Sequence, residues 1–174
     1  MLNKRIEKTT IEILGTVSLN SLPIPIEEIA RQRGLDIKAY DLGEGISGVL
    51  AIDSGKGTIG YNPRESKVRQ RFTIAHELGH FELHHKRNEL FVDKEFSVMF
   101  RDESSSTGEN KKEQEANAFA AAILMPEKAL RQAIENNGFD ISEEKSLKEL
   151  SKIFQVSTTA MSYRIANLNI FAGI

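Results

Sequence analysis

The feature that most constrains this chain is the pentapeptide His76-Glu77-Leu78-Gly79-His80. On an α-helix, residues four apart project from the same face, so the two imidazoles lie side by side and can grip one metal ion. Glu77 then stands beside the open coordination position, where a carboxylate can take a proton from a metal-bound water. The alternative, two unrelated surface histidines, is less favoured because the 174 residues contain only four histidines. The motif predicts a helical metal site with hydrolytic chemistry.

The composition restricts both the metal ligands and the partners. The chain has no cysteine, so a metal must be held by histidine and carboxylate. Its net charge of −2 provides no overall basic field that would attract nucleic acid or an anionic membrane. No apolar run approaches the ~20 residues that span a bilayer, and the N-terminus lacks a secretory apolar core. We therefore expect a cytoplasmic protein without a membrane partner.

Hydrophobic periodicity predicts an α+β fold with a small antiparallel sheet beside the helix that carries the motif. The expected elements are a helix from Ile6 to about Leu19, a short helix over 26–33, a strand over 35–40, a hairpin over 45–61 turning at Asp53-Ser54-Gly55, a long helix over about 66–85, a strand or lid over 89–100, a mobile loop over 102–109, a helix over 113–125, and two or three short C-terminal helices. The long helix is apolar on two sides, which is typical of a helix buried between layers.

No repeat and no long linker divides the chain, so residues 1–174 are expected to form a single domain built around the metal site. Within it we expect an N-terminal helix over about 1–22, a core over 23–126 that carries the metal motif and a helical C-terminal region over 127–174.

A catalytic zinc site needs a third protein ligand, with water in the fourth position. The extended zincin pattern would place Gly at position 83 and His at position 86, where this chain has Leu83 and Lys86. His84 and His85 follow too soon on the same helix. A carboxylate from the helix over 113–125 is the better candidate, and two are present.

The choice between Glu113 and Glu115 depends on the buried face of that helix. Glu113 lies roughly 50° from the centre of its apolar face and Glu115 roughly 110° away, so Glu113 is favoured and Glu115 stays open. Asn117, one turn beyond Glu113, shares its side and could accept the remaining ring N–H of a ligand histidine. The alternative for Glu113 is an ordinary solvated acid in the first helical turn.

Two segments together resemble the ImmA/IrrE-type metallopeptidase family. They are Arg71-Phe72-Thr73-Ile74-Ala75-His76-Glu77-Leu78-Gly79-His80 and Glu113-Gln114-Glu115-Ala116-Asn117-Ala118-Phe119-Ala120-Ala121-Ala122-Ile123-Leu124-Met125-Pro126, preceded by a hairpin that ends in Tyr61-Asn62-Pro63. The resemblance implies a zincin-like core in which His76, His80 and a glutamate, best matched by Glu113, bind Zn²⁺ and Glu77 is the general base. It also implies a cytoplasmic endopeptidase, often encoded on mobile elements, that cleaves a helix-turn-helix repressor by attack of a zinc-bound water.

The tetrahedral oxyanion of such a reaction needs a further hydrogen-bond donor. Tyr61, Tyr163 and Arg164 are candidates, although each of these residue types is more often structural.

The segment from Leu147 to Ile165 resembles a helix-turn-helix, with Val156-Ser157 suited to the turn and N-cap. Gln155 stands where a turn glycine is usual, and the second helix carries a single cation, Arg164. We therefore expect this segment to pack on the core or bind protein, with DNA binding unlikely. Two alternatives to the peptidase stay open: a DNA-binding or repressor-binding regulator with a non-catalytic metal site, and an inactive metal sensor.

Overall fold

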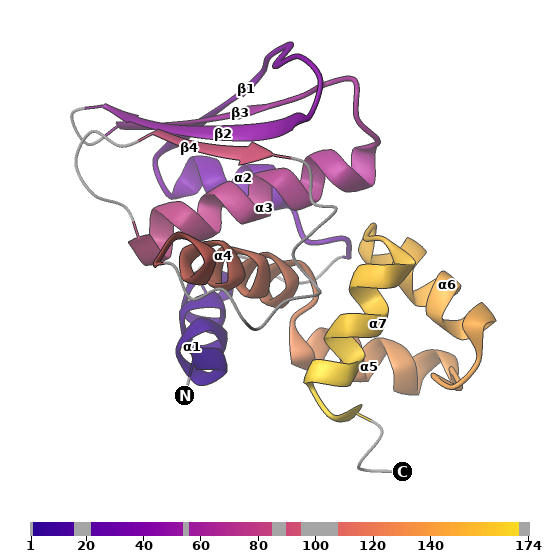
Figure 1. Ribbon diagram of the computed structural model, residues 1–174. Coiled ribbons are helices and arrows are strands. Elements are labelled where there is room, and N and C mark those ends of the chain that lie inside the picture. Colours follow the sequence, from indigo (N-terminus) through magenta and orange to yellow (C-terminus); the bar gives the residue numbers. More distant parts are fainter. Residues whose placement is uncertain (1, 16–21, 54–55, 85–89, 95–107, 171–174) are drawn as a thin grey trace.

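The computed structural model describes residues 2–15, 22–53, 56–84, 90–94 and 108–170 (Figure 1). The elements along these residues are α1 (Leu2–Leu14), α2 (Ile26–Gln32), β1 (Leu35–Ala39), β2 (Ile46–Asp53), β3 (Lys56–Tyr61), α3 (Lys67–His84), β4 (Leu90–Lys94), α4 (Gly108–Leu124), α5 (Glu127–Asn137), α6 (Glu144–Phe154) and α7 (Thr158–Asn167). The mixed α+β class is as predicted. Most of the predicted mobile loop and the turn at Ser54-Gly55 lie outside the described residues.

The sheet has the strand order β1-β3-β2-β4. Strands β2 and β3 form the predicted antiparallel hairpin, with Leu50 opposite Ile59, and β4 pairs antiparallel with β2 on its other side. Strand β1, however, pairs parallel with β3. The prediction of an antiparallel sheet was wrong because the chain crosses the end of β3 between β1 and β2, and a strand's own hydrophobic pattern does not tell which neighbour it pairs with.

The molecule is layered, with α3 between the sheet and α4. Helices α2 and α3 cover one face of the sheet, α4 lies on the far side of α3, and α1 packs against α4 (Figure 1). Burial of Leu50 and Ile59 on the sheet and of Ile74 and Leu78 on α3 follows from this arrangement. A helix enclosed on both sides needs apolar residues on both sides, which explains the double stripe in its sequence.

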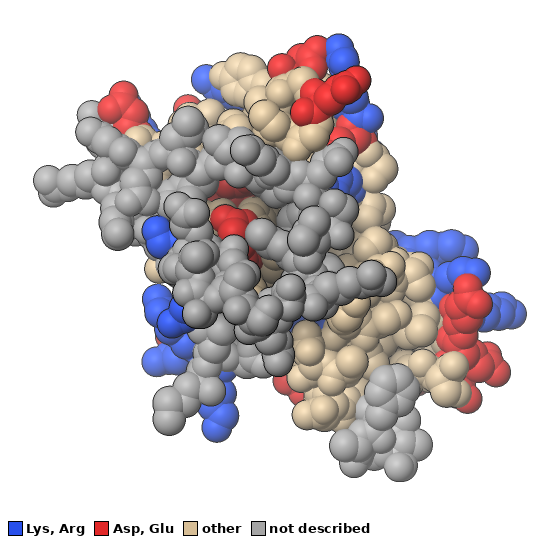
Figure 2. Space-filling view, in the orientation of Figure 1, with Lys and Arg blue, Asp and Glu red and all other residues tan. Residues whose placement is uncertain are grey.

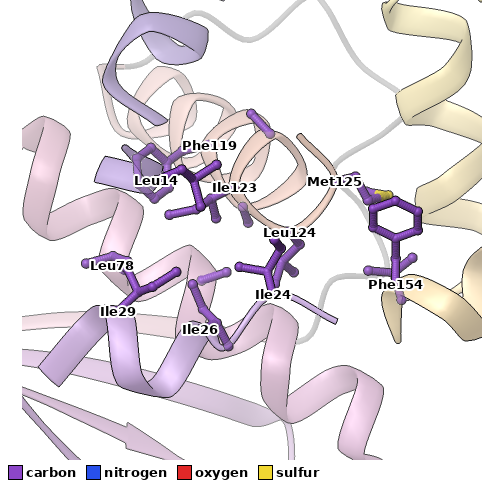
Figure 3. Packing of buried hydrophobic residues seen from close by; sticks show 14 of the residues in the cluster. Leu14, Ile24, Ile26, Ile29, Leu78, Phe119, Ile123, Leu124, Met125 and Phe154 are labelled. Atoms are coloured by element: carbon purple, nitrogen blue, oxygen red, sulfur yellow. The ribbon is translucent and has the colours of Figure 1, made fainter. Parts of the chain in front are cut away.

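The hydrophobic core is continuous from the α2 segment to the C-terminal helices. Figure 3 shows Ile26, Ile29 and Leu78 on one side of it and residues of α4, including Phe119 and Ile123, on the other. Met125 and Phe154 extend the same cluster toward α6. All seven side chains are essentially inaccessible to solvent, so the C-terminal helices share buried surface with the core.

Helices α6 and α7 are joined by a tight turn. Gln155 has a φ of 50° and caps α6 in the left-handed region, where glycine is favoured. Ser157 then caps α7, its hydroxyl accepting a hydrogen bond from the amide of Ala160. Over the described residues, no helix combines the length and the apolar character that crossing a membrane requires.

Candidate metal centre

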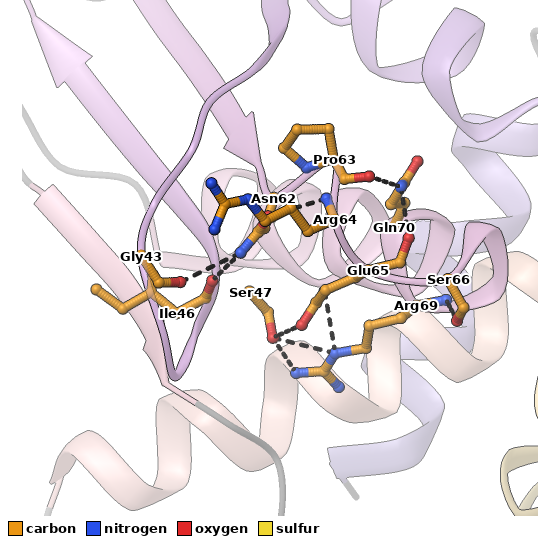
Figure 4. Close-up of polar contacts among 10 residues, drawn as sticks. All are labelled: Gly43, Ile46, Ser47, Asn62, Pro63, Arg64, Glu65, Ser66, Arg69 and Gln70. Carbon is orange, nitrogen blue, oxygen red and sulfur yellow. Dashed lines mark hydrogen bonds and ion pairs between the residues drawn. The ribbon is translucent and has the colours of Figure 1, made fainter.

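The start of α3 is fixed to the sheet by a polar network (Figure 4). The Asn62 side chain donates to the carbonyls of Gly43 and Ile46, both at 3.3 Å, and accepts from the amide of Arg64. Ser47 on β2 donates to Glu65 and accepts from the guanidinium of Arg69 on α3 at 2.7 Å. These bonds set the position of α3 before its first functional residue.

Three potential ligand atoms from two helices converge beside α3. Nε2 of His76 and Nε2 of His80 are 3.0 Å apart. The Glu113 carboxylate of α4 lies 3.2 Å from His76 Nε2 through one oxygen and 3.1 Å from His80 Nε2 through the other. The histidines are fully buried and the glutamate side chain is 27% exposed. Such a group of one carboxylate and two imidazoles can hold a metal ion.

The spacing of these atoms suits zinc. Ligands about 2.0–2.1 Å from a tetrahedral centre are about 3.3–3.4 Å from one another. The three separations found, 3.0 to 3.2 Å, lie slightly inside that value. Two neutral imidazoles and one carboxylate are also a ligand set that catalytic zinc uses, with the fourth position left for water. Both the geometry and the donor chemistry therefore fit the metal that the sequence predicts.

Asn117 orients one of the rings. Its side-chain oxygen lies 2.9 Å from Nδ1 of His76, and because an amide oxygen only accepts, Nδ1 donates to it; with a metal bound, Nε2 would present its lone pair to the ion. Helix α4 thus contributes both a carboxylate that faces the ligand atoms and, one turn later, a residue that sets the tautomer of a neighbouring histidine. Of the five residues that the sequence predicted for the site, the structure brings His76, His80, Glu113 and Asn117 together around the ligand atoms, while Glu77 lies on the side of α3 that faces the sheet.

Close approach of α3 and α4 makes this convergence possible. A Cβ at Gly79 would lie 3.1 Å from Phe119 and 3.2 Å from the backbone of Ala116. The glycine inside the motif therefore lets the two helices come near enough for Glu113 to reach the histidines. Helix α4 begins at Gly108, so Glu113 lies in its second turn and is not the first-turn acid of the alternative interpretation.

The burial of Glu115 differs from our expectation. We expected it to project away from the core, yet it is only 6% exposed. The reason is that α4 packs against α1 as well as α3, so more than one of its faces is covered. Glu115 is nevertheless not one of the three residues whose ligand atoms converge.

Glu77 is completely buried and faces the sheet. A Cβ added at Gly48 of β2 would lie 3.2 Å from Glu77 Oε1 and 2.2 Å from Thr73 Cγ2. Glycine at this position therefore avoids an overlap with Thr73 and a tight contact with the Glu77 carboxylate. Sequence reasoning did not single out Gly48, because the signal is a contact between two elements and not a local pattern.

Burial and hydrogen bonding shift two pKa values at the centre. Burial lowers the pKa of His80, which outweighs the opposing hydrogen bond with Glu113. Burial alone would raise the pKa of Glu113, but the hydrogen bonds with His76 and His80 bring it down to about 2. Both shifts favour the metal-ligating forms, a neutral imidazole and an ionised carboxylate.

The three oxyanion candidates from the sequence do not form a group at the centre. Arg164 is buried, donating to the Met125 carbonyl and forming a bidentate pair with Glu7. Tyr163 is 43% exposed on α7, and Tyr61 is partly buried against the core. Of the two excluded histidines, His84 ends α3 and His85 lies outside the described residues.

Comparison with known proteins identifies the sequence family. The family model Peptidase_M78, described as the IrrE N-terminal-like domain, matches residues 30–166. Metallopeptidase ImmA of Bacillus subtilis is 28% identical over 149 residues, which cover 85% of this chain and 79% of that protein. Radiation response metalloprotease IrrE of Deinococcus radiodurans is 33% identical over 134 residues, 76% of this chain but only 37% of that protein.

Two further matches bear on context and fold. The uncharacterized immunity region protein 2 of Bacillus phage phi105 is 29% identical over 102 residues, 58% of each chain. A solved structure of a Mycobacterium tuberculosis transcriptional regulator superposes with a TM-score of 0.59 at 21% identity, covering 95% of this chain and 46% of that one. The structural likeness concerns the fold, and this chain spans less than half of that regulator.

Proposed function

This chain belongs to the Peptidase_M78 family and is a metallopeptidase, a hydrolase of peptide bonds; we propose that its metal is zinc and that it is an endopeptidase cleaving a helix-turn-helix transcriptional repressor. The observation that carries the proposal is the convergence of His76 Nε2, His80 Nε2 and the Glu113 carboxylate, all separated by 3.0 to 3.2 Å. Two histidines and one carboxylate are the three protein ligands that a catalytic zinc site uses, whereas a closed structural site takes four.

Each residue has a separate task in this mechanism. His76, His80 and Glu113 would hold the ion, and Asn117 would keep His76 in the ligating tautomer. When bound, zinc supplies a Lewis acid that acidifies a coordinated water and polarises the scissile carbonyl. Glu77 would take the proton of the attacking water on a carboxylate oxygen and deliver it to the amine leaving group. Its complete burial against Gly48 restricts the carboxylate to few positions, which suits a group that must be placed accurately.

A repressor as the substrate is supported by the relatives. One is a metallopeptidase named ImmA, and another takes its name from a phage immunity region. The family also includes a radiation response metalloprotease, so peptide-bond hydrolysis accompanies more than one biological context. We propose that the substrate is a protein and that the reaction takes place in the cytoplasm.

The competing function is a DNA-binding or repressor-binding regulator with a non-catalytic metal site. The fold likeness to a transcriptional regulator and the α6–α7 pair favour it. The position of Arg164 argues against DNA binding. This residue is the one cation of α7, and it is 5% exposed and paired with Glu7. The surface over α7 in Figure 2 is accordingly without Lys or Arg. Phosphate contacts dominate affinity for DNA, so this helix is poorly equipped to read it.

The experiment that separates these functions compares Glu77→Gln with the unchanged protein. Zinc-loaded protein is incubated with a panel of helix-turn-helix repressors from the same genome, and cleavage is followed by mass spectrometry. We expect the variant to keep its zinc and to lose at least about 100-fold in rate, as for removal of a general base. Glu82→Gln, a change of the same kind on the same helix, is the control and should cleave normally.

Cleavage that persists in the Glu77→Gln variant would refute the mechanism. A zinc-loaded, unchanged protein that binds a repressor without cutting it would favour the regulator.

A further inference from the structure

The face of α3 that carries the two histidines continues toward the start of the helix as an apolar strip. Val68, Phe72, His76 and His80 follow one another at intervals of four residues, so they share one side of the helix. The rings of Phe72 and His76 are neighbours, with centroids 6.4 Å apart. A chain lying along this side of α3 would therefore pass directly from the metal centre onto Phe72 and Val68.

A cavity of about 350 Å³ lies at that end of the strip. Val68 and Phe72 form one wall, and Val156 and Ala160, from the turn before α7 and from its first turn, form the other. Arg69 also lines it, but its guanidinium is held by Ser47 and Glu65, which leaves mainly its aliphatic stem for the wall. The volume is at the low end for ligand pockets and suits one or two apolar side chains.

We propose that this cavity is a specificity pocket of the peptidase, taking an apolar side chain of an extended substrate segment. The inference rests on the proposed function, because it assumes that a peptide crosses the metal centre. The helix rises about 1.5 Å per residue, so Phe72 and Val68 lie about 6 and 12 Å along the axis from His76. An extended peptide advances about 3.3–3.6 Å per residue, which places the captured side chain two or three residues from the scissile bond.

This assignment gives the α6–α7 turn a task other than reading DNA. The hydroxyl of Ser157 holds the amide of Ala160 at 3.1 Å, and Val156 is anchored in the core at 6% exposure. The wall that the C-terminal region contributes is therefore rigidly placed. Substrate choice would depend on contacts from α3 and from the start of α7, which are far apart in the sequence: Val156 follows Phe72 by 84 positions.

Filling the cavity from either wall tests the proposal. Ala160→Phe narrows it from α7 and Val68→Phe from α3, while Ala166→Phe places the same ring on an exposed position of α7 and is the control. The zinc-loaded proteins digest a library of peptides prepared from a bacterial proteome, and the residues around each cut are counted by mass spectrometry. The preference for Leu over Ala two or three residues from the cut should fall roughly 10-fold in both filled variants and stay unchanged in the control.

A second arm does not depend on cleavage. The unchanged protein is titrated with N-acetyl-leucine methylamide and N-acetyl-alanine methylamide while the methyl NMR signals of Val68, Val156 and Ala160 are recorded. We expect the leucine probe to shift these signals and the alanine probe to shift them at least several-fold less. Melting temperatures of all variants identify any that fail to fold. If one of the two filled variants does not fold, the cleavage preference of the other one tests the proposal.

The outcomes separate the two proposals. If the leucine probe binds in the cavity but no peptide is cut, the pocket stands and the endopeptidase proposal fails. If peptides are cut but the probe leaves the methyl signals unmoved, or a folded filled variant keeps the original preference, the pocket is refuted and the peptidase stands.

Discussion

The side-chain oxygen of Asn117 on α4 lies 2.9 Å from Nδ1 of His76 on α3, on the side of the ring opposite the converging Nε2 atoms. One helix therefore determines how the other presents its imidazole. Replacing Asn117 with Ala should leave the ring free to rotate or to exchange tautomers, and zinc affinity should fall by about 10- to 100-fold. Competition with a chromophoric chelator measures this. The control is Gln114→Ala, at an exposed position of α4; equal affinities of the two variants would show that Asn117 does not orient the ring.

The contact of Gly48 with α3 predicts a rescue. A methyl at position 48 would overlap Thr73 Cγ2 at 2.2 Å and crowd Glu77 Oε1 at 3.2 Å. Gly48→Ala should lower the free energy of unfolding by about 1–3 kcal/mol and impair cleavage. Thr73→Ser removes the clashing methyl but keeps the hydroxyl, so the double variant should recover most of the stability. Denaturant unfolding of the four proteins tests this, and simple additivity of the two changes would contradict it.

Arg164 is expected to be structural. It joins α7 to α1 through Glu7 and to the end of α4 through the Met125 carbonyl. Arg164→Met should destabilise the protein by roughly 3 kcal/mol, because it leaves Glu7 without its partner. Arg131→Met, which breaks the exposed pair with Glu127, should cost less than about 1 kcal/mol. Similar losses in thermal unfolding for the two variants would be inconsistent with this role.

The metal-free protein should lose stability in acid. His80 and Glu113 both have pKa values below their ordinary ones, so the unfolded chain takes up their protons first as the pH falls. The contribution of Glu113 to the free energy of unfolding is fully present above its ordinary pKa of 4.5 and disappears as the pH falls toward about 2. The His80 contribution is lost as the pH falls below 6.5. Urea unfolding at a series of pH values measures both contributions. In the Glu113→Gln variant, the free energy of unfolding should change less between pH 4.5 and 2 than in the unchanged protein.

Local sequence patterns predicted what depends on neighbours along the chain. The spacing from His76 to His80 requires only that the segment be helical, and the β2–β3 hairpin requires two alternating runs around a short turn. Helical projection also selected Glu113 over Glu115, and Glu113 is the residue that meets the histidines, although Glu115 is the more buried of the two. Each of these results follows from the geometry of one element.

What the sequence could not supply are the contacts between elements. The parallel pairing of β1 depends on where the chain crosses the sheet, and the burial of Glu115 depends on α1 packing against α4. The role of Gly48 and the cavity between α3 and α7 have the same origin. The single-domain organisation over residues 1–174 stays a prediction.

The central claim is that His76, His80 and Glu113 hold one zinc ion. The most direct measurement is the zinc content of the purified protein and three variants by inductively coupled plasma mass spectrometry, with circular dichroism to establish folding. We predict about one zinc per chain for the unchanged protein and for Glu115→Gln, and strongly reduced content for His80→Ala and Glu113→Gln. Retention of zinc in Glu113→Gln together with its loss in folded Glu115→Gln would contradict the assignment.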